Sequence, residues 1–392
     1  MVASAASGLA PAGGWGLSVC AEIGYKGLIN YSGGAGVWGD DRRVFVAMSG
    51  GVDSAAAALL LQQAGCDVTG VTLRLHHYKD RPGLCGSADD IETARSVAAA
   101  MGIPHMVLDL CELFQRQVMD RFVWAYTHGR TPNPCIDCNR EIKFGALLDW
   151  ALAQGADAIA TGHYARLRQD DSGRWQLLRG VDRRKDQTYF LYQLTQRQLA
   201  HLCLPVGDYE KPALRALAAA HGLSNAQKAD SQDICFVPDG DYVSFLRQYG
   251  GVEPSPGDFV DEAGLVLGRH QGLECYTIGQ RKGLGVSADA PLYVLGKDLD
   301  RGTILLGGDD RLYTRELTAE RVNWLSIPEP AGPLSVTAKT RYSQRESAAT
   351  VEPLPGGRIR VMFQEPQRAI TPGQAVVFYD GELVLGGGTI CP

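Results

Sequence analysis

Apolar and polar residues alternate with two different periods along the first half of the chain. Short, nearly continuous apolar runs, which are typical of buried parallel strands, occur at residues 44–48, 67–75, 105–110 and 158–162. Longer stretches with apolar residues at helical spacing predict helices at about 54–65, 87–102, 112–127 and 140–155. Strands that alternate with helices in this way predict an α/β domain with a doubly wound parallel sheet.

The pattern changes after about residue 225, where short strands with glycine turns replace the helices. A hairpin is predicted at 257–269, and four strand-rich segments follow it: PLYVLGKDLDRGTILLG, LSVTAKTRYS, RIRVMFQ and AVVFYDGELVLGGGTI. The last contains an Asp-Gly pair, which favours a tight hairpin turn. We therefore predict an α/β domain at 44–224, a small central domain at 225–288 and a C-terminal antiparallel β-barrel at 289–392.

Residues 1–43 precede the first predicted strand and differ from the rest. Their opening, MVASAASGLAPAGGWGLSVC, is rich in Ala, Gly and Ser and contains no Arg, which a transit peptide would need. We expect a disordered extension or a start codon assigned too far upstream, and we predict no function there.

The composition restricts the class of protein in three respects. No apolar run reaches the roughly 18 residues of a membrane span, which predicts a soluble protein. The net charge of −6 gives no basic surplus, so a nucleic-acid contact would have to use local patches. Ten Cys without a secretory signal favour a reducing compartment such as the cytoplasm, where thiols bind metal or take part in chemistry.

The segment MSGGVDS, residues 48–54, lies between the first predicted strand and its helix. Gly50 and Gly51 let the backbone turn sharply and approach a ligand closely. Consecutive N–H groups and the start of a helix bind anions such as phosphate, and the two serines can donate hydroxyl groups. Asp53 can hold Mg²⁺. No Lys follows the glycines, so this is not the usual P-loop.

The segment TPNPCIDCNREIKF, residues 131–144, carries Cys135 and Cys138 three positions apart. Such a pair can bind a metal ion, alternate between the dithiol and disulfide forms, or carry sulfur. Cys138 is predicted near the start of the helix at 140–155, whose dipole would lower the pKa of its thiol. Cys235, in ADSQDICFVP, is the second candidate for thiol chemistry. The remaining cysteines are predicted to be small buried hydrophobes, apart from Cys85, which is left undecided: Cys20, Cys66, Cys111, Cys203, Cys275 and Cys391.

These motifs together resemble a known family. SGGVDS resembles the signature of the PP-loop ATP pyrophosphatases, which split ATP between the α and β phosphates and adenylate a substrate oxygen. The tRNA-specific 2-thiouridylases among them are similar to this chain from about residue 44 onward, through five motifs in the same order: TPNPCIDCNREIKF, ATGHYAR, DRRKDQTYFLY, DSQDICFVP and YTIGQRKGLG. Residues 44–224 would then form the PP-loop domain.

The resemblance implies a reaction in which sulfur replaces O2 of the wobble uridine of certain tRNAs. ATP, with Mg²⁺, adenylates O2 and so makes it a good leaving group. The cysteine matching Cys235 carries a persulfide, and the one matching Cys138 attacks it, which releases the sulfur and leaves a disulfide. The base must leave the anticodon stack to react. A cysteine desulfurase, acting directly or through relay proteins, would supply the sulfur.

The resemblance also implies site residues. Those that match ATP-binding positions are Ala47, Met48, Ser49, Gly50, Gly51, Val52, Asp53, Ser54, Leu73 and Gly162. Those that match tRNA-contacting positions are Asn133, Pro134, Cys135, His163, Lys185, Asp186, Gln187, Arg341, Tyr342 and Gln374. The Gly-rich, basic segment at 279–285 is a further candidate for RNA contact.

The chain departs from the family at Cys135, where many members carry Asp. With Cys138 and Cys235 it would make three thiols, and three Cys can hold a [4Fe–4S] cluster with one iron open. Three interpretations follow. A persulfide relay with Cys135 as a bystander comes first, sulfide delivery by a cluster comes second, and a structural zinc or an inert pair comes third.

Two other functions fit parts of the sequence. Another PP-loop enzyme, such as a 7-cyano-7-deazaguanine synthase or an amidotransferase-linked synthetase, would need a four-Cys zinc site or a glutamine-hydrolysing module, and neither is visible. A non-catalytic RNA-binding protein would not need SGGVDS together with two matched thiols. ATP-dependent tRNA 2-thiolation is therefore the predicted function.

Overall fold

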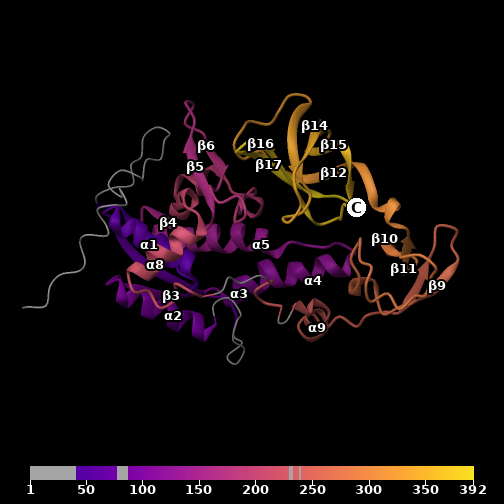
Figure 1. The fold of residues 1–392 in the computed structure, drawn as a ribbon, viewed down its shortest axis with the longest axis horizontal. Helices are drawn as coiled ribbons and strands as arrows, with labels where there is room; N and C mark the ends of the chain where they lie inside the picture. The colour runs from indigo at the N-terminus through magenta and orange to yellow at the C-terminus, as the bar shows by residue number, and fades with distance from the viewer. Residues whose placement is uncertain (1–40, 77–86, 229–232, 238–239) are drawn as a thin grey trace, which may run out of the picture.

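The computed structural model describes residues 41–76, 87–228, 233–237 and 240–392 (Figure 1). The predicted N-terminal extension lies almost wholly outside this range, as do Cys20 and Cys85. Figure 1 shows the first domain, the central domain and the β-barrel as separate groups of elements, with the helix α4 (Asp120–Thr127) of the first domain reaching towards the central domain.

The first domain is built on a five-stranded parallel sheet in the order β3-β2-β1-β4-β7. Its strands are β1 (Arg43–Ala47), β2 (Asp67–Arg74), β3 (His105–Asp109), β4 (Ala158–Ala160) and β7 (Leu202–Cys203). Val44 of β1 aligns with Val68 on one side and Ala158 on the other, and all these pairs are parallel. The strand order reverses at β1, which places the ligand-binding crevice of such sheets just beyond its carboxyl end. The predicted doubly wound sheet is confirmed.

Helices cover both faces of this sheet. Along β1, Val44 and Val46 belong to one apolar core and Phe45 to the other, as strand alternation requires. The first core is completed by α1 (Val52–Gln63), α2 (Ala88–Ala100) and α8 (Lys211–Ala220). The second contains residues of α3 (Cys111–Phe114), α4 (Asp120–Thr127), α6 (Leu147–Ala153) and α7 (Gln196–Ala200).

The helix predicted at 140–155 starts earlier than expected. It begins with α5 (Pro134–Asp137), continues through a π-helical stretch (Cys138–Ala146) and ends with α6. Pro134 occupies the first turn, where proline is favoured because no helical partner is needed there for its missing N–H. The predicted start at residue 140 is therefore wrong, and both cysteines of the pair are helical.

A hairpin of the first domain reaches the barrel. It consists of β5 (Ala165–Gln169) and β6 (Trp175–Arg179), which the sequence pattern did not predict. β6 pairs antiparallel with β17 (Leu383–Ile390) through Leu178 and Leu383, so the hairpin continues the sheet of the barrel. Figure 1 shows the hairpin, in magenta, beside the yellow strands β16 (Ala375–Asp380) and β17.

The central domain carries α9 (Tyr242–Gln248) and a four-stranded sheet in the order β10-β11-β8-β9. Its strands are β8 (Gly257–Val260), β9 (Val266–His270), β10 (Tyr293–Asp298) and β11 (Thr303–Gly307). Phe259 and Ile304 lie in its small core. Strands β10 and β11 fall on the barrel side of the division predicted at residue 288, but they pair within the central sheet.

The last domain is a closed antiparallel barrel, as predicted. Its strands follow the order β12-β15-β14-β13-β16-β17, and pairing of β12 with β17 closes it. Their bounds are β12 (Tyr313–Asn323), β13 (Leu334–Lys339), β14 (Ser347–Leu354), β15 (Arg358–Arg368), β16 (Ala375–Asp380) and β17. Inward side chains such as Val361 and Phe378 fill its core, and the Asp-Gly turn predicted between the last two strands connects β16 to β17.

Candidate functional site

The SGGVDS loop leaves the carboxyl end of β1 at the point where the strand order reverses. Gly50 has a φ of +73°, and a Cβ on it would lie 2.9 Å from the carbonyl oxygen of Asp90, so only glycine fits there. The hydroxyl of Ser54 accepts a hydrogen bond from the Ser49 N–H (3.2 Å) and donates one to the Gly51 carbonyl (3.0 Å). Within the described residues no side chain caps α1, so its first N–H groups point into a site that suits an anion.

Two other predicted ATP-binding residues lie beside this loop. Gly162, just beyond β4, approaches the backbone so closely that a Cβ would lie 2.6 Å from the carbonyl carbon of Asp53. On β2, Leu73 is buried, and its neighbour Thr72 donates its hydroxyl to the Met48 carbonyl at 2.8 Å. The carboxyl ends of β1, β2 and β4 therefore bring the predicted positions together, as a doubly wound sheet requires.

Asp53 was predicted to hold Mg²⁺, but its carboxylate has protein partners. The Lys211 ammonium lies 2.7 Å from both carboxylate oxygens, and the Tyr164 hydroxyl donates to one of them at 2.7 Å. Lys211 is the first residue of α8 and is only 6% exposed. Nothing local in the sequence indicated Lys211, because it is 158 positions from Asp53.

The segment DRRKDQ supports both partners of Asp53. At its start, the Asp182 carboxylate accepts a hydrogen bond from the Lys211 backbone N–H at 3.2 Å. At its end, Gln187 exchanges two hydrogen bonds of 3.0 Å with the backbone of Tyr164. The segment predicted to contact tRNA is therefore connected at both ends to the residues that hold the phosphate-loop carboxylate.

Within that segment, Asp186 has a structural environment. Its carboxylate is buried, lies 3.5 Å from the Arg179 guanidinium and accepts the Thr188 hydroxyl at 2.9 Å. Arg179 in turn lies 3.9 Å from the ring centre of Tyr379 in the barrel. The Asp186 carboxylate thus holds Arg179, which reaches the barrel, and contact of Asp186 with tRNA stays a prediction. Arg183 and Arg184 beside it are exposed.

Asn225 is a further residue that the sequence did not indicate. Its side-chain amide donates to the Gly50 carbonyl at 3.1 Å, and its buried Oδ1 has no protein hydrogen-bond partner among the described residues. A polar atom buried without a partner beside the loop is suited to a ligand donor.

The cysteine pair lies on the first turns of the helix that begins at Pro134. Cys135 is exposed in the first turn, whereas Cys138 lies one turn further and is buried in the core of the first domain. Cys235 is half-buried and packs against that same core. Asp137 lies 3.6 Å from Arg121, and burial raises the pKa of its carboxyl group.

These thiols do not form a metal centre in the structure. Throughout 41–76, 87–228, 233–237 and 240–392, no three or more His, Cys, Asp or Glu side chains group together in a way that could hold a metal ion. The arrangement of Cys135, Cys138 and Cys235 therefore does not fit the ligand set of a [4Fe–4S] cluster.

Several predicted tRNA-contacting residues line one cavity of about 250 Å³ at the junction of the three domains. It is lined by Thr131, Asn133, Thr277, Arg341, Tyr342, Ser343, Thr371 and Gln374. The amide of Gln374 donates to the carbonyls of Thr131 (3.0 Å) and Pro132 (3.3 Å). The loop before β16 thus holds the segment that leads into the cysteine helix.

Arg341 and Tyr342 play different parts in this cavity. Arg341 donates to the Thr371 hydroxyl (2.7 Å) and the Ala369 carbonyl (2.9 Å), and burial lowers its pKa. Tyr342 is 37% exposed, and its ring centre lies 4.5 Å from that of Phe190. Arg341 shapes the wall, while Tyr342 offers an aromatic surface on which a base can stack.

His163 was predicted near tRNA, but its ring is buried. Its Nδ1 lies 2.7 Å from the Thr161 hydroxyl, and its ring packs against Phe144. Burial, with help from Lys143, holds the pKa of His163 well below its usual value, so the imidazole is neutral at pH 7. Contact with tRNA through this ring would require the packing around it to open.

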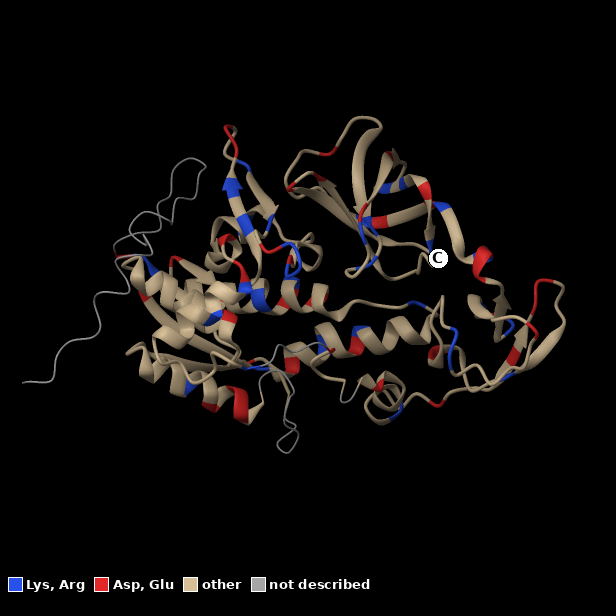
Figure 2. Cartoon of the chain, in the orientation of Figure 1, with Lys and Arg blue, Asp and Glu red and all other residues tan. Residues whose placement is uncertain are grey.

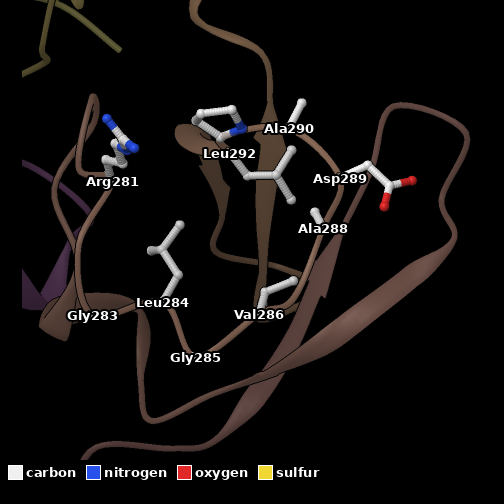
Figure 3. A pocket seen from close by; sticks show the side chains of 10 residues that line it. Arg281, Gly283, Leu284, Gly285, Val286, Ala288, Asp289, Ala290 and Leu292 are labelled. Atoms are coloured by element: carbon white, nitrogen blue, oxygen red, sulfur yellow. The ribbon is translucent and has the colours of Figure 1, made fainter.

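Two further features of the molecule are the distribution of its Lys and Arg residues and a second, larger cavity in the central domain. Figure 2 shows Lys and Arg on the β5–β6 hairpin and in the region between the hairpin and the barrel. The larger cavity, about 440 Å³, lies in the central domain and is lined by residues 281 and 283–292 except Ser287. Figure 3 shows the aliphatic side chains of Leu284, Val286 and Leu292 in it. The segment predicted at 279–285 to contact RNA contributes Arg281, Gly283, Leu284 and Gly285 to its lining.

The chain resembles known proteins along almost its whole described length. Three family models match it: a tRNA methyl transferase HUP domain at 42–239, a tRNA methyl transferase PRC-barrel domain at 243–308 and an aminomethyltransferase beta-barrel domain at 314–390. The chain is 52% identical over 351 residues to the tRNA-specific 2-thiouridylase MnmA of Moorella thermoacetica, covering 88% of this chain and 98% of that protein. It is 47% identical over 355 residues to the same enzyme of Acetivibrio thermocellus, covering 89% and 99%.

Solved structures are more distant. The U34-tRNA thiolase NcsA from Methanococcus maripaludis with its [4Fe-4S] cluster is 16% identical, with a TM-score of 0.34, over 55% of this chain and 70% of that one. Likeness at this level carries no functional argument. None of the helices in the described residues is both long and apolar enough to cross a membrane.

Proposed function

Since the chain belongs to the family of tRNA-specific 2-thiouridylases, we propose that it converts the wobble uridine of tRNA to 2-thiouridine with the use of ATP. The observation that carries this proposal is the cavity of about 250 Å³ in which Asn133, Tyr342 and Gln374 meet at the start of the cysteine helix. Residues from three domains would surround a flipped-out base there.

ATP is proposed to bind at the SGGVDS loop. The N–H groups of the loop and of the start of α1 would hold phosphate oxygens, with Gly50 and Gly162 allowing close approach. Asp53 would hold Mg²⁺, which neutralises charge on the phosphates. In the adenylation step, O2 of the uracil bonds to the α-phosphorus, and the bond to the bridging oxygen breaks. Pyrophosphate leaves with that electron pair, and the N3 proton passes to solvent.

Sulfur transfer is proposed to use Cys235 and Cys138. A persulfide on Cys235 bonds through its outer sulfur to C2, and AMP leaves with the electron pair of the C2–O bond. The Cys138 thiolate then attacks the Sγ of Cys235, which breaks the S–S bond and leaves its electrons on the sulfur now attached to the base. The Cys138–Cys235 disulfide that results is reduced by an external thiol. No step is assigned to a cluster, because the three thiols do not form one ligand group.

The buried position of Cys138 bears on this scheme. Its thiol lies within the core of the first domain, and Cys235 is packed against that same core. The Cys138 thiol would therefore react away from bulk water, while the half-buried Cys235 stays accessible to a sulfur donor. A cysteine desulfurase or a relay protein of the cytoplasm would load Cys235.

The test is a reaction of the purified chain with unmodified tRNA, Mg·ATP and a persulfide donor. One 2-thiouridine, one AMP and one pyrophosphate per turnover are expected, measured by mass spectrometry of nucleosides and by nucleotide analysis. Cys235→Ser should abolish 2-thiouridine but still release pyrophosphate in a first turnover. Cys391→Ser, a half-buried cysteine of the barrel, is the matched control. Full thiolation by Cys235→Ser would overturn the sulfur-carrier assignment.

A further inference from the structure

The helix that carries the cysteine pair changes its winding at Cys138. The 9 residues Cys138–Ala146 are π-helical, a winding that is rare, occurs mostly as single turns and is often found at functional sites. Cys138 and Ile142 are buried at a spacing of four, and Leu147 and Ala151 are buried at the same spacing. The step from Ile142 to Leu147 is five. The additional residue therefore lets both halves of the helix face the same core.

Gln198 of α7 supports the π-helical stretch from outside. Its side-chain Nε2 donates to the carbonyls of Arg140 at 3.1 Å and Phe144 at 2.8 Å. A side chain that inserts into the hydrogen-bond ladder of a helix is an established cause of such irregular winding. Gln198 is itself buried, and its Oε1 accepts a hydrogen bond from the Thr195 N–H at 2.9 Å. Both ends of the amide are therefore fixed, and its two donors are directed at the helix.

The segment that leads to Gln198 makes two further contacts with the same helix. The side-chain amide of Asn139 donates to the Phe190 carbonyl at 3.2 Å, and the Arg140 guanidinium donates to the side chain of Gln193 at 3.3 Å. The ring centre of Phe190 lies 4.5 Å from that of Tyr342, which lines the base cavity. One segment, 190–198, therefore contacts both the wall of the base cavity and the turn that carries Cys138.

We propose that Gln198 is a positioning residue for sulfur release, which keeps Cys138 on the buried face of its helix by holding the π-helical stretch. Without the two donors the stretch would return to α-helical winding. Cys138 would then turn relative to the core by about 100°, the rotation of one helical residue. Its thiol would leave the core against which Cys235 packs. This inference rests on the proposed function and deepens it by naming the residue that sets the geometry of the release step.

The first experiment measures the position of Cys138 without any reaction on tRNA. Full-length wild type and Gln198→Met, which keeps the length of the side chain but has no donor, are treated with iodoacetamide. Peptide mass spectrometry gives the alkylation rate of Cys138, with Cys391 of the barrel as the internal standard. The Cys138 rate should rise at least about tenfold in Gln198→Met, because loss of two hydrogen bonds favours the state in which this thiol is exposed.

Gln196→Met is the matched control. Gln196 lies on the same helix, and its side-chain amide also donates to two carbonyls, those of Trp175 at 2.9 Å and Leu325 at 2.8 Å. Neither carbonyl belongs to the cysteine helix. The two variants should lower the melting temperature to a similar extent, and only Gln198→Met should expose Cys138. Equal Cys138 alkylation in the two variants would contradict the role of Gln198.

A single turnover on tRNA tests the release step itself. In Gln198→Met the rate of 2-thiouridine formation should fall about 10- to 100-fold, the range for losing two neutral hydrogen bonds. Pyrophosphate release should stay within about twofold, because adenylation precedes the step that uses Cys138. The tRNA should accumulate in a disulfide with Cys235 that an added thiol cleaves. A defect of the whole fold would instead slow pyrophosphate release and thiolation together, and that result would overturn the assignment.

A second variant applies if Gln198→Met folds poorly. Gln198→Glu keeps an acceptor for the Thr195 N–H and so retains the cap of α7, but its carboxylate has no donor for the Arg140 and Phe144 carbonyls. It should show the same rise in Cys138 alkylation. A Cys138 rate equal to that of wild type in Gln198→Glu would mean that the donors do not hold the π-helical stretch.

The outcomes separate this inference from the proposed function. Wild type that forms no 2-thiouridine would overturn the proposed function, and the alkylation rates would still decide whether Gln198 positions Cys138. Wild type that forms 2-thiouridine, with unchanged Cys138 alkylation in both Gln198 variants, would leave the proposed function intact and overturn only the role of Gln198.

Discussion

The side-chain amide of Gln374 in the barrel donates to the carbonyl of Thr131 in the first domain at 3.0 Å. The Thr131 N–H in turn donates to the Pro372 carbonyl at 2.9 Å. Gly373 between them has a φ of +90°, and a Cβ there would lie 3.0 Å from the Thr131 nitrogen. The barrel therefore holds Thr131, which lies three positions before the helix that begins at Pro134. Because the contacts are made to the backbone of Thr131, they depend little on its side chain.

Replacing Gln374 with Ala removes these donors and should loosen the segment that forms one wall of the base cavity. We expect the KM for tRNA to rise about tenfold, the cost of roughly one hydrogen bond, while the affinity for ATP stays unchanged. Steady-state thiolation at varied tRNA concentration measures this. Gln364→Ala, at an exposed position of β15, is the control. A change in ATP affinity instead would contradict the assignment of Gln374 to the tRNA side.

Cys135 should be dispensable if sulfur moves by persulfide. We expect Cys135→Ala to retain most thiolation activity, whereas Cys138→Ser should lose product by at least about a hundredfold because the sulfur cannot be released. Iron and acid-labile sulfide are measured per chain after purification without oxygen. Near-stoichiometric iron that disappears in Cys135→Ala would mean that the thiols rearrange around a cluster, and the relay would have to be abandoned.

Gly50→Ala should damage the phosphate loop specifically. A side chain at φ +73° costs about 1–2 kcal/mol, and the added Cβ would also meet the Asp90 carbonyl at 2.9 Å. Gly173→Ala is a matched control, because Gly173 has a φ of +85° but open surroundings in the turn of the β5–β6 hairpin. Both variants should lower the melting temperature slightly, and only Gly50→Ala should lose ATP affinity. Equal ATP affinity in the two variants would mean that the loop is not part of the nucleotide site.

The buried His163 predicts a pH dependence of stability. Its pKa is lower in the folded chain than in the unfolded chain, so the unfolded state binds more protons between the two values. The stability that its neutral form provides is complete above the unfolded pKa near 6.5 and is lost as the pH falls below it, by up to about 1.4 kcal/mol per pH unit.

Melting temperatures at pH 7.5 and 5.5 test this. The drop on acidification should be smaller in His163→Gln than in wild type, while His221→Gln, at an exposed position, should behave like wild type. An unchanged drop in His163→Gln would mean that other groups carry the acid sensitivity.

The sequence pattern alone predicted those elements that are specified by residues close together in the chain. The apolar runs around Val44, Val68 and Ile159 became the central strands, and the glycines of SGGVDS marked the phosphate loop. The helix was predicted to start at residue 140, after both cysteines, although Pro134 is of a type favoured in the first turn of a helix and opens it in the structure.

The remaining features depend on contacts between distant residues. Lys211 and Asn225 reach the loop from α8 and the segment after it, 158 and 175 positions away from their partners, and no local pattern marks them. Asp186 was predicted to contact tRNA, and the sequence did not indicate its pairing with the buried Arg179 of β6, the strand that pairs with β17 of the barrel. Burial of a charge cannot be seen in a sequence when its partner belongs to another element.

The pairing of β6 with β17 has a consequence for how the protein is made. Leu177 and Leu178 of the first domain pair with Val384 and Leu383, about two hundred residues later in the chain. While the ribosome is still synthesising the barrel, the edge of β6 has no partner strand, and an unpaired strand edge invites association with other chains. The hairpin therefore completes its sheet only after β17 has been synthesised, and slow translation between β6 and β17 would prolong the time for which this edge is exposed.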